Sequence, residues 1–253
     1  MKPRTIAALI LASVCFCIGL YSVVMGERTT ASPSPSLISL FQGDGISSWF
    51  SGNKDERTTI LVVGVDRFDR PDPVLQAVWI ITLHPTEKEV LFSGVPTNLA
   101  LDDAGIVRLN SFFAWSPESG VTPPFIEALE RALRLQVDTI AVLDERGFGT
   151  LVDYLGGLPF EGGVLSGDQV LALHTVFRDD PVGLVRLQAS VLENLEPQIR
   201  KLGAAPDLET LLALIPEHAQ LSEHTAQFVL SVSHLLPLEE EQVGVEVILS
   251  PVP

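Results

Sequence analysis

The sequence contains few cysteines and few basic residues. Its two cysteines, Cys15 and Cys17, both lie near the N-terminus, so the rest of the chain has no disulfide. This excludes a small disulfide-stabilised scaffold. Sixteen Lys and Arg stand against 32 Asp and Glu, which gives a formal net charge of −16. Because nucleic-acid binding needs a basic surface that displaces counterions, we expect no nucleic-acid partner.

The sequence also lacks the motifs of several common catalytic sites. It has no Gly-rich Walker loop, no G-x-S-x-G segment, and no pair of His or Cys at metal-ligand spacing. The five histidines occur singly, and His218 and His224 are interpreted as solvated residues at helix ends. Motifs of these kinds therefore assign no function.

One long apolar run does occur, at residues 6–25, and it contains no charged residue. At 1.5 Å per residue, a helix of this length crosses a bilayer core about 30 Å thick. Lys2 and Arg4 precede the run, and positive charge stays on the cytoplasmic side. We therefore expect residues 1–5 in the cytoplasm, a single-pass anchor in the cell membrane, and an extracytoplasmic C-terminal part.

Two other interpretations of residues 6–25 remain open. A cleaved secretory signal would have a shorter apolar region and an A-x-A-like site, which we do not find. A lipid-modified cysteine is the second alternative, although Val14 and Phe16 are poor flanking residues for it. The uncleaved anchor is preferred over both.

Residues 26–57 are rich in Ser, Gly, Pro and Thr and show no sustained period, which predicts a linker. Residues 58–253 show no tandem repeat and no further break, so we treat them as one domain.

The domain alternates strand and helix patterns. Helix signals include Asp179 and Asp180 before Pro181, a favoured N-cap followed by a proline at the first helical position. Strands are predicted at Thr58–Val65, Ala77–Leu83, Val90–Val95, Val137–Leu143 and Val243–Leu249, and a tight turn at 84–86. Helices are predicted at Pro123–Leu135, Phe148–Leu155, Pro181–Gly203 and Ser222–Leu236. The pattern indicates an α/β domain with a mixed central sheet sandwiched by helices.

A cluster of charged residues directly follows the first strand. Functional sites of α/β sheets gather beyond the carboxyl ends of strands, so this cluster is the best-placed candidate site. An ordinary polar loop with mutually neutralising charges is the alternative. The cluster consists of Asp66, Arg67, Asp69, Arg70 and Asp72.

Several segments, taken in order, resemble the LytR-CpsA-Psr (LCP) family. They are ILVVGVDRF, AVWIITLHP, VLFSGVP, RLNSFFAW, VDTIAVLDERGFGTLVDYLGGL, LSGDQVLAL and VRLQASVL. The resemblance implies an extracytoplasmic α/β domain that transfers polyprenyl-pyrophosphate-linked glycopolymers to the bacterial cell wall. It further implies arginines that hold the pyrophosphate, carboxylates that bind Mg²⁺, and an apolar tunnel for the lipid tail.

The implied site is only partly kept in this sequence. Gly64 and Asp66 match the glycine and the metal-binding carboxylate at the end of the first strand. Gln76 stands where an acidic residue is implied, and Thr97 and Asn98 stand where Arg-Asp is implied. Further implied arginines fall on Thr175, Phe177, Leu184 and Leu187, whereas Gln188 is kept. The framework residues Asn110, Phe148, Gly156, Gly157 and Gly167 all fit.

Four other arginines, Arg67, Arg70, Arg178 and Arg186, are candidates to replace the missing ones. Arg178 is one residue beyond an implied position, and one step along a helix is a rotation of about 100°. From Arg57 onward, 12 basic residues stand against 28 acidic ones, so the overall field opposes a pyrophosphate.

Three functions follow as hypotheses. The preferred one is a binding protein for a polyprenyl-type lipid-linked substrate, with a degenerate catalytic site and no cofactor. The second is an active phosphotransferase that uses Mg²⁺ and a rearranged arginine set. It requires Arg67, Arg70 and either Arg178 or Arg186 to converge within about 5 Å of one anion position. The third is a non-catalytic envelope scaffold.

Overall fold

The computed structural model of the chain describes residues 57–84, 89–102, 104–116, 118–160, 162–199, 217–221 and 243–251. The predicted anchor at 6–25, the linker up to residue 56, the turn beyond residue 84 and the predicted helix Ser222–Leu236 lie outside the described residues. Within the described ranges, no helix is both long enough and apolar enough to cross a membrane.

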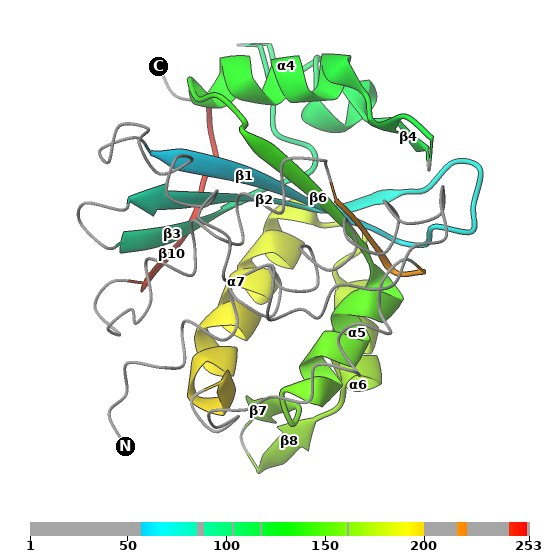
Figure 1. Cartoon of the computed structure of the whole chain (residues 1–253), viewed down its shortest axis with the longest axis vertical. Helices are drawn as coiled ribbons and strands as arrows, with labels where there is room; N and C mark the ends of the chain where they lie inside the picture. Colours follow the sequence, from blue (N-terminus) through cyan, green and yellow to red (C-terminus); the bar gives the residue numbers. More distant parts are fainter. Residues whose placement is uncertain are drawn as a thin grey trace, which may run out of the picture.

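A six-stranded mixed sheet forms the centre of the domain, with the strand order β10-β3-β2-β1-β6-β9 (Figure 1). β1, β2 and β3 form an antiparallel meander, β6 pairs parallel with β1, and β10 pairs parallel with β3. The mixed α/β architecture predicted from the sequence is confirmed. The strands are β1 (Thr58–Val65), β2 (Leu75–His84), β3 (Glu89–Val95), β6 (Thr139–Asp144), β9 (Ala219–Leu221) and β10 (Val243–Val247).

Strand direction gives the sheet one distinctive edge. β1, β3, β6 and β10 all run the same way, so their carboxyl ends meet at one edge, which we call the carboxyl edge. β2 and β9 run in the opposite direction and begin there. Loops that are far apart in sequence are therefore neighbours at this edge.

β1 is central because its two faces are both apolar. Leu61, Val63 and Val65 point to one face and are almost fully buried, whereas Val62 points to the other. A continuous β-branched run of this kind fits a strand that is covered on both sides.

Helix α4 (Pro123–Leu133) covers the first face (Figure 1). Phe125 and Leu129 lie one turn apart on α4 and are fully buried against β1 and β2. The helix ends where Arg134 adopts a left-handed conformation with φ of 50°, two residues before the predicted end. The 3₁₀ helix η2 (Leu109–Phe112) and the short strands β4 (Trp115–Ser116) and β5 (Gly120–Val121) complete this side.

Helix α7 (Pro181–Ile199) packs on the opposite face, and it begins at Pro181 as the predicted N-cap and first-position proline indicate. The Asp180 carboxylate accepts a hydrogen bond from the Gly183 N–H at 3.0 Å. Close packing depends on Gly94 of β3, because a Cβ there would lie 2.6 Å from Val185. The small residue thus brings α7 directly onto the sheet.

Helices α5 (Glu145–Tyr154) and α6 (Gly167–Val176) form an antiparallel pair beside α7 (Figure 1). The hairpin of β7 (Leu158–Phe160) and β8 (Gly163–Leu165) joins them. Their shared core with α7 contains Val152, Leu155, Leu158, Val170, Val191 and Leu195. α5 begins three residues before the predicted start at Phe148, because Asp144 caps it.

The α5–α6 contact is a crossing of two glycines. A Cβ on Gly167 would lie 2.0 Å from the carbonyl oxygen of Gly149, far inside van der Waals contact. The Asp153 carboxylate of α5 also accepts a hydrogen bond from the Gly167 N–H at 2.6 Å, which caps α6. α6 therefore starts against α5 with no room for a side chain.

We predict that Gly167→Ala lowers the free energy of unfolding by about 1–3 kcal/mol, because the methyl group forces the two helices apart. Urea unfolding of the full-length chain measures the effect. Gly163→Ala is the matched control, since a Cβ there meets nothing within 4 Å. Equal stability of the two variants would contradict the prediction.

Candidate functional site

The carboxyl edge brings together most of the residues singled out in the sequence. Asp66, Arg67 and Arg70 lie in the β1–β2 loop, Gln76 lies at the start of β2, and Thr97 and Asn98 follow β3. Three residues that the sequence did not place in the site join them: Asp144 at the end of β6, Glu145 at the start of α5, and His218 directly before β9.

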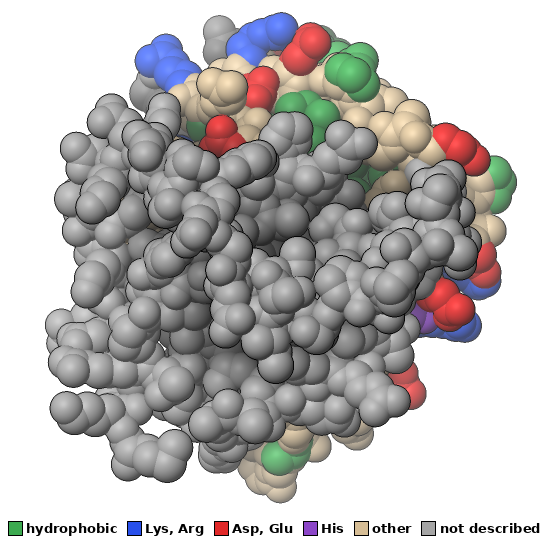
Figure 2. Space-filling view, viewed as in Figure 1, with side chains coloured by type: hydrophobic (Ala, Val, Ile, Leu, Met, Phe, Trp, Pro, Cys, Tyr) green, Lys and Arg blue, Asp and Glu red, His purple; other side chains and the backbone are tan. Residues whose placement is uncertain are grey.

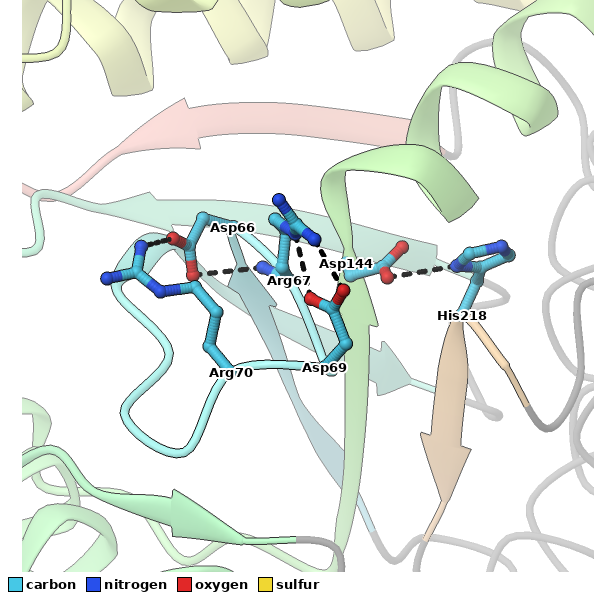
Figure 3. A network of polar contacts seen from close by, with 6 residues as sticks. All are labelled: Asp66, Arg67, Asp69, Arg70, Asp144 and His218. Atoms are coloured by element: carbon cyan, nitrogen blue, oxygen red, sulfur yellow. Dashed lines mark hydrogen bonds and ion pairs between the residues drawn. The ribbon is translucent and has the colours of Figure 1, made fainter.

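Asp66 fixes the β1–β2 loop. One carboxylate oxygen accepts hydrogen bonds from the N–H groups of Arg67 at 2.9 Å and Val74 at 2.7 Å. The other oxygen accepts from Nη1 of Arg70 (Figure 3). Asp66 is 8% exposed, so these donors compensate for the water it has lost.

Arg67 and Asp69 form a second ion pair in the same loop (Figure 3). Nε of Arg67 donates to Asp69 at 2.8 Å, and Nη2 donates to the second carboxylate oxygen. The hydrogen bond raises the pKa of Arg67 and lowers the pKa of Asp69. Both side chains are more than half exposed, so this pair contributes little to stability.

Asp144 joins three elements at the edge. Its carboxylate accepts from the Gly147 N–H at 2.8 Å, which caps α5, and lies 2.9 Å from Nδ1 of His218 (Figure 3). The Asp144 N–H also donates to the His218 carbonyl at 3.1 Å. The interpretation of His218 as a solvated helix-end residue is therefore wrong: it directly precedes β9 and holds that strand to β6.

Glu145, the first residue of α5, is partly buried beside Asp66 and Asp144. Burial, and to a smaller extent the two aspartates, raise its pKa, whereas the charge of Arg178 lowers it. Arg178 thus lies close enough to act on this edge, although its side chain is exposed. Arg186 is an exposed residue of α7. The structure brings Arg67 and Arg70 into one loop, each bonded to a carboxylate, and their convergence on one anion stays a prediction.

Gln188 connects α7 to the sheet. Its Oε1 accepts from Nε1 of Trp79 at 3.1 Å, and its Nε2 donates to the Gln76 carbonyl at 3.4 Å. The side chain is 7% exposed. Both ends of this amide are therefore already used within the fold.

Thr97 and Asn98 take part in the loop through their carbonyl groups. The Thr97 carbonyl accepts from the Asn110 N–H at 2.9 Å, and the Asn98 carbonyl accepts from Nη1 of Arg108 at 3.3 Å. Thr97 is buried and Asn98 is half-buried. The side chains of Thr97 and Asn98 are neutral, so these two positions supply no positive charge at the carboxyl edge.

The donor set does not fit the Mg²⁺ ion that the sequence resemblance implies. Mg²⁺ needs carboxylate lone pairs in octahedral geometry, and both Asp66 oxygens already accept hydrogen bonds from the chain. Gln76, which stands where the resemblance implies a second acidic residue, supplies no negative charge for a metal ion. Within the described ranges, no group of three His, Cys, Asp or Glu side chains is arranged to hold a metal.

An aromatic pair supports the β1–β2 loop from the α4 side. The rings of Phe68 and Trp115 stack with their centroids 4.7 Å apart. Trp115 Nε1 donates to Oε1 of Gln220 in β9 at 2.7 Å. The loop that carries Asp66 and Arg70 is thus connected through Trp115 to β9, the last strand of the sheet on that side.

Acidic and basic side chains occur together in the β1–β2 loop, where Arg67 pairs with Asp69 and Arg70 with Asp66. On the face shown in Figure 2, acidic side chains lie along the rim of the described part with basic side chains among them. This agrees with the acidic composition of the chain. Any anion must therefore bind through local donors.

His174 lies in the last turn of α6, behind the edge, and stacks on Phe148 of α5 with ring centroids 5.4 Å apart. It is 8% exposed, and its Nε2 has no hydrogen-bond partner among the described residues. Burial lowers the pKa of His174 to about 4. The imidazole is therefore neutral at pH 7.

The described domain has the fold of LytR-CpsA-Psr proteins, as the sequence resemblance implies. TagV from B. subtilis matches with a TM-score of 0.57 and 15% identity, covering 78% of this chain and 85% of that chain. Protein gbs0355 from Streptococcus agalactiae matches with a TM-score of 0.55 and 18% identity, covering 76% of this chain and 77% of that one.

TagT bound to LIIa-WTA matches with a TM-score of 0.54 and 15% identity, covering 77% of this chain and 79% of that one. At these identities the likeness shows the fold. No family model matches the sequence, and no curated protein matches it.

We predict that the domain loses stability as the pH falls from about 6.5 to about 4. In this window the unfolded chain protonates His174 and the folded chain does not, so acid favours unfolding. The full loss is about 3 kcal/mol. Urea unfolding at pH 7, 5.5 and 4 measures it, and His174→Leu should show a smaller loss by that amount. Parallel pH profiles for the two proteins would contradict the prediction.

Proposed function

We propose that the chain is an LCP-like cell-envelope protein that binds a polyprenyl-type lipid-linked substrate at the carboxyl edge, with a degenerate transfer site. The fold is shared with TagT, one structure of which is bound to LIIa-WTA. Residues 6–25 would anchor the protein in the cell membrane and place the domain outside the cell. The partner is then a lipid-linked glycopolymer or a related lipid.

One observation carries the loss of transfer: the guanidinium groups of the β1–β2 loop are bonded to carboxylates of the same loop. Two positions where the resemblance implies arginine are Leu184, which is 4% exposed, and Leu187, which packs in the core below α5 and α6. Apolar contacts thus replace anion donors. Each lost donor costs transition-state stabilisation of roughly 3 kcal/mol, about a hundredfold in rate.

Apolar surface between the sheet and α7 supports binding of a lipid tail. The side chains around Trp79 and Val185 are only partly buried, although they belong to the inner face of the domain. An apolar ligand that covered them would gain about 25 cal/mol per Å². These side chains are Val62, Ala77, Phe92, Leu192, Val245 and Val247.

A second candidate function is transfer of the glycopolymer by a rearranged arginine set. The position of Arg178 favours it, because its charge acts on Glu145 at the same edge as Arg70. This function requires the arginines of the β1–β2 loop to contact the substrate together with Arg178.

The experiment uses the full-length chain in detergent with a polyprenyl-pyrophosphate-linked glycopolymer and Mg²⁺. We expect retention of the donor on the purified protein and no release of polyprenyl phosphate above the protein-free rate. Arg178→Ala tests the second function, and Arg131→Ala, an exposed α4 residue, is the control of equal charge change.

Release that Arg178→Ala abolishes and Arg131→Ala leaves intact would show that the chain is a transferase. Failure to retain the donor would refute both functions and leave the envelope scaffold.

A further inference from the structure

We propose that Arg70 takes the place of a divalent cation at Asp66, so that the carboxyl edge binds a pyrophosphate without Mg²⁺. The proposal rests on the proposed function for its ligand and concerns how the anion is held. Its starting point is the mismatch between the donor set around Asp66 and the coordination that Mg²⁺ requires.

The hydrogen bonds of Asp66 already use both of its carboxylate oxygens, and they take three of its four lone-pair sites. Two N–H groups from the two ends of the loop, those of Arg67 and Val74, share one oxygen, and Arg70 takes the other. Arg70 lies only four positions after Asp66, and Pro71 follows it directly, with Pro73 two positions later. Proline fixes φ, which restricts the conformations in which the arginine could leave the carboxylate.

Arg70 has donors left over for a ligand. Its guanidinium carries five N–H groups, and among the described residues only Nη1 is bonded, to Asp66. The side chain is 48% exposed, and its second Nη points away from Asp66 (Figure 3). A planar guanidinium can bond a carboxylate with one group and a phosphate with the others. It thus bridges the two anions, as a metal ion would.

Arg67 has fewer unused N–H donors than Arg70. It uses Nε and Nη2 for Asp69, so the edge of its guanidinium that suits a bidentate phosphate contact is already occupied. The Asp69 carboxylate that binds Arg67 is exposed, whereas the Asp66 carboxylate that binds Arg70 is buried. Arg70 is therefore the arginine of this loop that combines a fixed position with unused donors.

The first test measures binding of farnesyl pyrophosphate to the full-length wild-type chain by calorimetry, in Mg²⁺ and in EDTA. We expect the dissociation constants to agree within about twofold, and Mg²⁺ titrated by itself to give no saturable binding. An affinity at least tenfold higher in Mg²⁺, or saturable Mg²⁺ binding that Asp66→Asn removes, would overturn the proposal.

The second test compares variants in EDTA. Arg70→Ala should weaken binding about tenfold or more, the effect of losing one charge-assisted contact, whereas Arg131→Ala should bind as the wild type does. Arg70→Lys keeps the charge at Asp66 but lacks the planar fork, so it should fall between them. Thermal unfolding of each variant identifies any loss of folding, and the comparison uses those that unfold as the wild type does.

Wild-type affinity in Arg70→Ala would overturn the role of Arg70. Absence of farnesyl pyrophosphate binding under every condition would instead refute the proposed function. The two failures are therefore distinguishable.

Discussion

The parallel pairing of β1 with β6 determines the site. In this register Val65 lies beside Asp144, so the residues that follow the two strands, Asp66 and Glu145, are neighbours as well. Three acidic groups thereby come together at the edge of a sheet, where they repel one another. Everything else at the edge supplies donors for these groups: the backbone of the β1–β2 loop, the N-terminus of α5, His218 and the arginines. Much of the local structure thus serves to compensate for the negative charge that the β1–β6 pairing brings together.

This compensation balances the charge of the buried carboxylates at the edge. A buried carboxylate needs compensation whether or not a substrate is present. Here the compensation comes from groups of the chain: two N–H groups and a guanidinium for Asp66, and an N–H group and an imidazole for Asp144. The framework therefore does not depend on a bound ion for its charge balance, and the packing of α5, α6 and α7 depends on glycines at which a Cβ would clash.

Most of the fold could be predicted from local sequence. β1 is a continuous β-branched run, and α7 has an aspartate cap and a proline at its first position, so their positions follow from short-range chemistry. α6 was not predicted as a helix, although Ser166 and Gln169 form a capping box at its start. The apolar residues of α6 show little helical periodicity, because α6 packs between α5 and β8. The capping box at its N-terminus was therefore the more informative sign of a helix.

The site was harder to predict because its contacts link residues that are far apart in sequence. The sequence placed Asp66 and the loop arginines correctly after a buried strand, but it gave no sign that Arg70 would return to Asp66. His218 was misinterpreted, since its partner Asp144 lies 74 positions away. Gln188 is expected to line a binding site on resemblance, and the structure adds a contact that the sequence did not indicate: its amide joins α7 to Trp79 and Gln76 of β2, across more than a hundred positions.

The position of β10 has a consequence for how the chain acquires this structure. Ser93 of β3 and Glu246 of β10 share a hydrogen bond across 153 positions, so β3 lacks its parallel neighbour until the final strand is available. Pairing at such separation carries a large loop-closure entropy and slows folding. Until then, the β3 backbone is an open template for strands of other molecules. A chain synthesised from its N-terminus would therefore be vulnerable to aggregation until β10 has docked.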